Sequence, residues 1–214
     1  MVERVWEFGA EDVSIIGNLF LTGKYNADRT IALAGSEDKA NKYYKIKIGA
    51  NVSDLIGQVS DDVRIISGDV LTGTKLSNNQ YIGFYNTSLT LIPEGNKYRM
   101  LGWLPFTYNN IHSTSKTSLS WLFPKKKYDL NTNLNGEERA LVVTGEMEDV
   151  LPMDIYPMQL LKACIAGDIE KMENLGIYEV APEDFALIDY VNTSKIEAQD
   201  IIRLGLDLMI TEVG

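Results

Sequence analysis

His112 is the only histidine of the chain, and three hydroxyl residues, Ser113, Thr114 and Ser115, follow it directly. Nucleophilic catalysis needs a nucleophile, a base and a group that orients the base, and histidine is a common base. No serine stands in the glycine-flanked turn that exposes a nucleophile in hydrolases. The pattern therefore favours a polar residue of a connecting segment, and a hydrolase that uses His112 is the third of three functional hypotheses.

Residues 68–75 (GDVLTGTK) resemble a phosphate-binding loop. In that motif a lysine follows the second glycine directly and a helix begins there, so that backbone amides converge on the phosphate. Here Thr74 separates Gly73 from Lys75, and the next residues, LSNN, do not start a helix. We therefore expect no nucleotide at this loop.

Cys164 is the only cysteine of the chain. An iron–sulfur cluster needs about four thiolates, and a zinc site needs a set of Cys and His ligands. The acidic pairs at 61–62 and 183–184 lack the pattern of a calcium-binding EF-hand loop. The sequence thus predicts no catalytic, cofactor-binding or metal-binding residue, and Cys164 is expected to be a small core residue on an apolar helix face.

Aromatic and basic residues gather in a polar stretch of low periodicity, which predicts a partner-docking surface because such residues are typical of interfaces. The residues are Trp103, Trp121, Lys125, Lys126 and Lys127. Two alternatives stay open. The aromatic side chains could instead cover the core beneath a long connector. The lysines could face the acidic part of the chain or an anionic membrane edge.

The composition is that of a soluble globular protein, with 45% hydrophobic and 23% charged residues among 214. No apolar run approaches the roughly 20 residues of a membrane span. The single cysteine excludes an internal disulfide and indicates a reducing, cytosolic compartment. Residues 1–143 contain 16 basic and 15 acidic residues, a net charge of +1, whereas residues 144–214 contain 4 and 15, a net charge of −11. This asymmetry predicts two modules, and the acidic one argues against nucleic acid as a partner.

The first module reads as a helix followed by short strands. The helix covers residues 10–22, with Val13, Ile16, Leu19 and Phe20 on its apolar face and Gly23 at its end. A second, short helix is predicted over 52–56, with Asn51 or Ser53 as its cap. Strands are predicted over 30–34, 43–48, 63–66, 81–85, 88–93 and 97–103. Strand, strand, short helix and strand form the order of a β-grasp unit, and the glycine layout over about 29–76 resembles the soluble-ligand-binding β-grasp (SLBB) domain.

The second module reads as a small bundle of helices. Helices are predicted over 157–166, 168–175, 182–190 and 194–210. Ser194 and Glu197 have the spacing of a capping box for the last helix. Ahead of the bundle, an Asn135-Gly136 turn precedes residues 140–144 (ALVVT), which predict a short buried strand because they contain no charge.

The stretch 134–161 (LNGEERALVVTGEMEDVLPMDIYPMQLL) resembles, nearly position by position, one typical of the family of the A subunit of the sodium-translocating NADH:quinone oxidoreductase (Nqr). Residues 14–20 (SIIGNLF) and 101–103 (LGW) are similar to the same family, and the match covers essentially the whole chain. The resemblance implies the C-terminal half of a protein about twice as long. It also implies kinship with the C subunit of the Rnf complex and the flavoprotein subunit of complex I.

The resemblance further implies a peripheral subunit on the cytoplasmic face of the bacterial inner membrane, docked on the membrane subunits of the Nqr complex. That complex oxidises NADH, reduces ubiquinone and pumps sodium ions with flavins and an iron centre, none of which is expected on this chain. The leading hypothesis is a docking and assembly part without a redox centre of its own, with a role in quinone access. The alternative is a stand-alone β-grasp module that binds a quinone or another small molecule.

We therefore expect an α+β fold: an SLBB-like β-grasp module with extra strands, followed by a small helical bundle. The expected parts are 1–28, a strand and helix left from a preceding domain; 29–104, the β-grasp and a β meander; 105–145, a connector; and 146–214, the acidic bundle.

Overall fold

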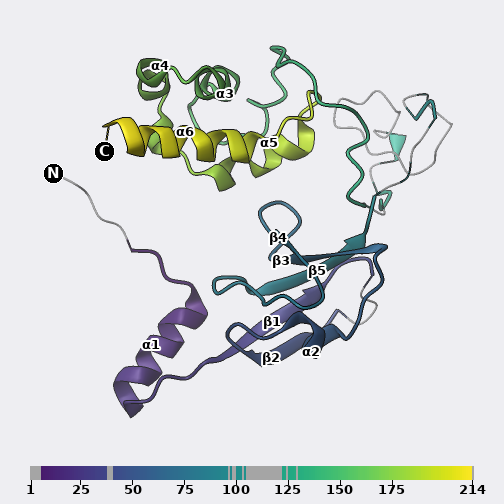
Figure 1. The fold of residues 1–214 in the computed structure, drawn as a ribbon, viewed down its shortest axis with the longest axis vertical. Coiled ribbons are helices and arrows are strands. Elements are labelled where there is room, and N and C mark those ends of the chain that lie inside the picture. The colour runs from purple at the N-terminus through teal and green to yellow at the C-terminus, as the bar shows by residue number, and fades with distance from the viewer. Residues whose placement is uncertain are drawn as a thin grey trace. The chain divides into compact units, whose positions relative to one another are not determined.

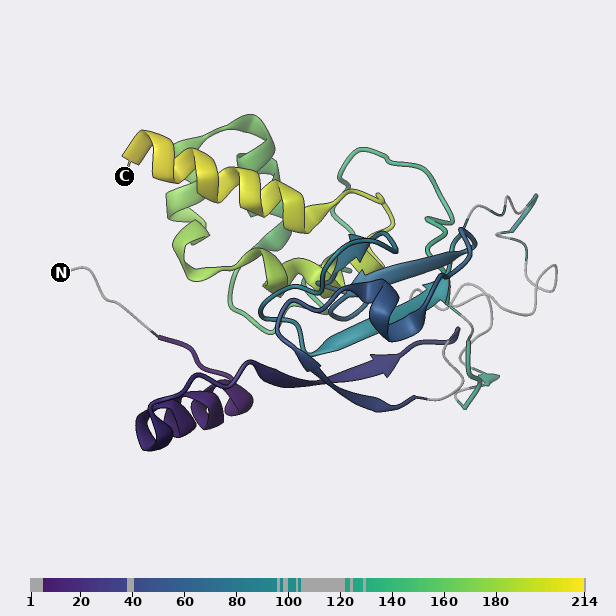
Figure 2. The ribbon, with the colours of Figure 1, turned by 60° about the horizontal axis from the view of Figure 1, so that its bottom comes forward.

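A computed structural model of the chain describes residues 6–37, 41–95, 97, 100–102, 104, 122–123, 125–128 and 130–213. The chain divides into two compact units. The sheet unit comprises Met1–Glu94 with Leu130–Thr132, and the helical unit comprises Gly95–Asp129 with Asn133–Gly214. Figures 1 and 2 show a mixed sheet in the first and a group of helices in the second, which confirms the predicted α+β class.

Five strands form one sheet in the order β2-β1-β5-β3-β4. β5 pairs in parallel with β1 and antiparallel with β3, so the strand of this sheet that comes last in the sequence lies at its centre. β2 and β4 pair antiparallel with β1 and β3 at the two edges. The strands are β1 Asp28–Ala34, β2 Tyr43–Lys47, β3 Val63–Ser67, β4 Thr74–Leu76 and β5 Ser88–Pro93.

The core of the sheet unit forms where alternate strand residues meet the short helix α2 (Val52–Ile56). Of the two caps that the sequence offered, Asn51 is the one used, since its side-chain oxygen accepts a 2.9 Å hydrogen bond from the backbone N–H of Ser53. The cap holds Val52 fully buried among the strand side chains. The buried cluster contains Ile31, Leu33, Val52, Ile65, Ile82, Leu89 and Leu91.

Most strand predictions are confirmed to within one or two residues, but two features differ. The predicted strand over 81–85 is wrong, because Tyr81 makes only an isolated bridge to Asn51 and residues 82–87 contain no strand. The sequence did not indicate β4, a strand of 3 residues that pairs with β3. The predicted strand over 97–103 falls largely outside the described residues.

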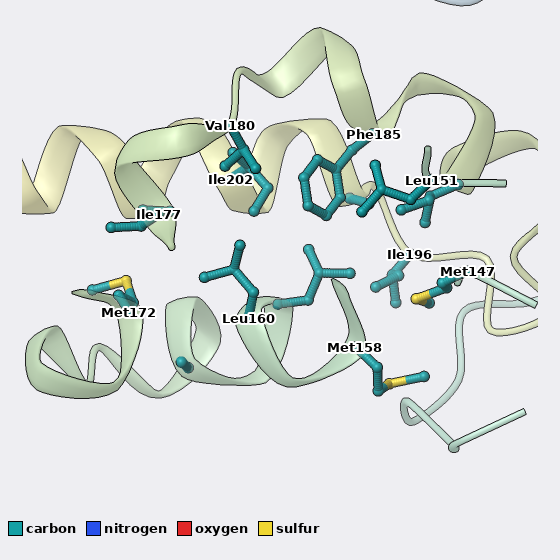
Figure 3. Packing of buried hydrophobic residues seen from close by; sticks show 14 of the residues in the cluster. Met147, Leu151, Met158, Leu160, Met172, Ile177, Val180, Phe185, Ile196 and Ile202 are labelled. Atoms are coloured by element: carbon teal, nitrogen blue, oxygen red, sulfur yellow. The ribbon is translucent and has the colours of Figure 1, made fainter. Parts of the chain in front are cut away.

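The helical unit buries one apolar cluster between its longest helices. Figure 3 shows Leu160, Phe185 and Ile202 pointing toward one another from different elements. Phe185 and Leu160 are both 0% exposed, so both lie fully inside this core. The elements are α3 Pro157–Ala166, α4 Ile169–Asn174, η2 Ile177–Glu179, η3 Pro182–Phe185, α5 Ala186–Val191 and α6 Ala198–Val213.

The start of α6 differs from the prediction. The helix begins at Ala198, and the carboxylate of Asp189 accepts hydrogen bonds from the backbone N–H of Ala198 and from the side chain of Gln199, the latter at 2.8 Å. Burial raises the pKa of Asp189, and these donors oppose the rise. Ser194 therefore does not cap the helix; its hydroxyl donates to the carbonyl of Ala140 at 3.1 Å.

α3 and α6 approach most closely at Gly205. A methyl group added there would lie 2.7 Å from the Cys164 sulfur and 3.3 Å from its β-carbon. Burial raises the pKa of the Cys164 thiol to about 11, so this side chain stays a neutral packing group at physiological pH.

We predict that Gly205→Ala destabilises the helical unit by about 1–3 kcal/mol, because overpacking outweighs the better helix propensity of alanine. Urea unfolding followed by circular dichroism measures the change. The matched control is Gly17→Ala in α1 (Ala10–Thr22), where the added methyl meets nothing within 4 Å and should not destabilise. Adding Cys164→Ala to Gly205→Ala should recover part of the loss, and an undiminished loss in the double variant would contradict the contact.

Candidate docking surface

α1 leaves its apolar side chains exposed. The helix covers the predicted residues and ends at Gly23, which adopts the left-handed conformation and donates its N–H to Leu19. None of its residues is buried, and Phe20 and Leu21 are 85% and 88% exposed. Figures 1 and 2 show the helix standing off the sheet beside the start of β1.

The contacts of α1 with β1 come from its acidic first turn. Asp12 forms an ion pair with Arg29, and Glu11 accepts a 2.8 Å hydrogen bond from the backbone N–H of Thr30. The less exposed positions of the helix are Glu11, Asp12, Ile15 and Asn18, which recur at helical spacing. The helix therefore turns its mainly polar face inward and its apolar face to solvent, the reverse of the usual amphipathic arrangement.

Arg29 is the buried partner in this contact, with 5% of its surface exposed. Its guanidinium carbon lies 5.5 Å from the centre of the Phe84 ring, within the range of a cation–π interaction. Its Nε has no hydrogen-bond partner in the described part of the chain. The charge of Arg29 is thus compensated chiefly by Asp12, and this ion pair holds the first turn of α1 together with the hydrogen bond between Glu11 and Thr30.

We define the α1 surface as the large apolar side chains on this helix and the segment before it. They are Trp6, Phe8, Val13, Ile16, Leu19, Phe20 and Leu21, each at least 38% exposed. Trp6 and Phe8 stack with their ring centres 6.4 Å apart. Soluble monomers rarely expose so many large apolar side chains together, so this surface is a candidate interface.

The residues predicted for docking are not among those of the α1 surface. Trp103 and Trp121 fall outside the described residues, as does His112. Lys125, Lys126 and Lys127 are exposed, and the Lys126 ammonium lies 5.1 Å from the centre of the Tyr128 ring. Their assignment to a docking surface stays a prediction.

The loop that resembles a phosphate site folds on an acidic side chain. Asp69 accepts hydrogen bonds from the backbone N–H groups of Leu71 and Thr72, at 2.7 and 2.8 Å. The hydrogen bond from Thr72 is the main reason that the pKa of Asp69 is lowered. A carboxylate therefore occupies the amides that a phosphate would need.

A shallow depression of about 390 Å³ lies in the sheet unit. Six of its nine lining residues are aliphatic, and Tyr44, Glu37 and Gln58 are the others, but most of the exposed lining surface is polar. The remaining lining residues are Leu33, Leu55, Ile56, Val59, Val63 and Leu91.

The described residues offer neither a membrane span nor a metal site. Among the described residues, no helix is both long and apolar enough to cross a membrane. Within the same residues, no group of three or more His, Cys, Asp or Glu side chains has the arrangement of a metal site.

Comparison with known proteins gives a consistent family. The model of the NQRA C-terminal domain matches residues 30–78. The A subunit of Na(+)-translocating NADH-quinone reductase from Cellvibrio japonicus is 38% identical over 207 residues, which are 95% of this chain and 46% of that protein. Its counterpart from Marinomonas sp. is 36% identical over 213 residues, 98% of this chain and 48% of that protein. The chain thus spans about half the length of the curated relatives it matches.

We predict that Asp12→Asn loosens α1 and destabilises the sheet unit by about 1–3 kcal/mol, because it leaves the Arg29 charge buried and unpaired. Amide hydrogen exchange should become faster in α1, and urea unfolding measures the energy. Lys47→Ala is the control: Lys47 pairs with Asp28 in the same unit but is 70% exposed, so its loss should cost under about 1 kcal/mol. Equal effects of the two variants would show that burial of Arg29 is unimportant.

Proposed function

Since this chain belongs to the family of the A subunit of Na(+)-translocating NADH-quinone reductase, of which it spans about half, we propose that it is a docking and assembly part of such a complex. The proposal gives the chain no redox centre. NADH, flavins, an iron centre and ubiquinone are handled by the complex as a whole, and this chain contributes to quinone access.

The observation that carries the proposal is the exposed α1 surface. Its apolar residues include Trp6, Phe8 and Phe20, and aromatic residues are the usual anchors of protein interfaces. The ion pair of Asp12 with Arg29 positions the helix before any partner arrives, which lowers the entropy cost of binding.

The charge of the chain supports attachment through proteins and not through lipid. The chain has a net charge of −10, so anionic lipid headgroups repel it. In our proposal it is a peripheral part on the cytoplasmic face of the bacterial inner membrane, and the membrane subunits of the Nqr complex hold it there.

We predict that the chain binds the other Nqr subunits, expressed together without their own NQRA protein, in a pull-down from detergent solution. Replacing both Phe20 and Leu21 by Asp should weaken binding at least tenfold, because it removes two of the most exposed apolar residues of the α1 surface. Tyr43→Asp is the matched control, since Tyr43 is 79% exposed on the edge strand of the same unit and should not matter. No binding by the unaltered chain would refute the proposal.

A second candidate function is a small-ligand module, which the depression beside Tyr44 favours. Aliphatic residues such as Val59 in its lining would contact a quinone ring, and Tyr44 and Gln58 offer polar groups for the ring oxygens. This function requires that the chain bind the ligand without other subunits.

We predict for this candidate that a short-chain ubiquinone gives saturable heat on titration into the chain. Val59→Phe should fill the depression and weaken binding at least tenfold, whereas Val70→Phe, at a residue 55% exposed in the β3–β4 turn, should leave it unchanged. Absence of saturable heat eliminates the ligand module.

A further inference from the structure

Residues 137–144 (EERALVVT) belong to no helix or strand. They also contain no turn or bend. The prediction of a buried strand over 140–144 is wrong in two respects: the segment has no strand partner among the described residues, and Val142 and Val143 are 62% and 67% exposed. The β-branched residues that favour a strand are therefore present without a sheet to receive them.

The segment is held at one end and free at the other. The backbone N–H of Arg139 donates to the carbonyl of Ser194 at 2.8 Å, and the hydroxyl of Ser194 donates to the carbonyl of Ala140 at 3.1 Å. From 141 to 144, the backbone groups make no hydrogen bond to any described residue. Unpaired N–H and C=O groups on consecutive residues without a turn or bend are what an added strand would pair with.

A groove of about 400 Å³ lies beside this segment. Leu141, Ile165 and Ile196 supply large apolar side chains to its lining, and Ile165 on α3 is 61% exposed. Glu138, Arg139 and Lys162 add charged groups. In strand addition, main-chain hydrogen bonds provide affinity and a groove of this kind receives alternate side chains of the added strand.

The negative charge around the segment favours a basic partner segment. Residues 137–149 contain five acidic residues and one basic residue, a net charge of −4, which Lys162 in the groove lining reduces to −3. A second copy of this segment would meet like charge, which disfavours self-pairing. An extended segment with basic residues at its ends is complementary.

We propose that residues 141–144 and the adjacent groove bind an extended, basic-flanked segment of a partner polypeptide by β-strand addition. The proposal goes beyond the docking function above, because it concerns the helical unit and a different mode of recognition. The partner strand pairs with the free backbone of 141–144 and places alternate apolar side chains over Leu141 and Ile165.

The test uses the full chain and a labelled synthetic peptide, Lys-Lys-Thr-Val-Thr-Val-Thr-Lys-Lys, in a fluorescence anisotropy titration. We expect saturable binding that weakens as salt is added, because the charged ends are exposed. A peptide of the same sequence with alternate backbone nitrogens methylated should bind at least tenfold more weakly, since it cannot donate its main-chain hydrogen bonds.

Variants of the chain locate the site. Ile165→Glu should weaken peptide binding at least tenfold, whereas Leu204→Glu, at a residue 69% exposed on α6, should not. Circular dichroism confirms that both exposed-site variants are folded. The proposal is overturned by any of three results: no peptide binding, equal binding of the methylated peptide, or equal effects of the two variants. It is also overturned if the chain dimerises and Ile165→Glu abolishes the dimer, since a second copy would then be the occupant.

Discussion

The burial of the Arg29 guanidinium determines how the sheet unit presents its apolar surface. A charge that is 5% exposed must be compensated, and Asp12 at the start of α1 supplies the opposite charge. The helix is thus held by its acidic turn, and the opposite face, which includes Phe20, is left to solvent. An ordinary amphipathic helix would bury that face in its own unit, and the docking function that we propose depends on this reversal.

In the helical unit, too, a carboxylate that is distant in the sequence determines the position of a helix end: Asp189 caps the start of α6. Asp189 satisfies the first amides of α6, and this leaves Ser194 free to hold Ala140. Ser194 therefore holds the segment at Ala140, and residues 141–144 beyond it make no backbone hydrogen bond to a described residue. Close packing at Gly205 and Cys164 keeps α3, which lines the adjacent groove, fixed against α6.

Local patterns predicted the elements well, because helix spacing, caps and strand alternation act over a few residues. Helix 10–22, its end at Gly23 and the cap at Asn51 were readable in this way. The orientation of α1 was not, because it rests on a pair 17 residues apart in the sequence, Asp12 with Arg29. The prediction of the start of α6 was wrong for a similar reason, because Asp189, nine residues before Ala198, caps the helix in place of the nearer Ser194.

Residues 140–144 have a strand's composition, but only the fold shows that no neighbouring strand in the described part of the chain pairs with them. Of the predicted docking residues, the three lysines are exposed, which the sequence alone suggested.

The central place of β5 also imposes an order of assembly on the growing chain. The pairs β1–β2 and β3–β4 join neighbours in sequence, whereas Ala32 in β1 pairs with Ser88 in β5, 56 residues later. Contacts of such long range form slowly, and until β5 leaves the ribosome no strand can join the β1–β2 pair to the β3–β4 pair. Each pair then exposes an inner edge able to pair with other nascent chains. Insertion of β5 closes both edges at once. The strand of the sheet that is synthesised last is therefore the one that completes the native sheet.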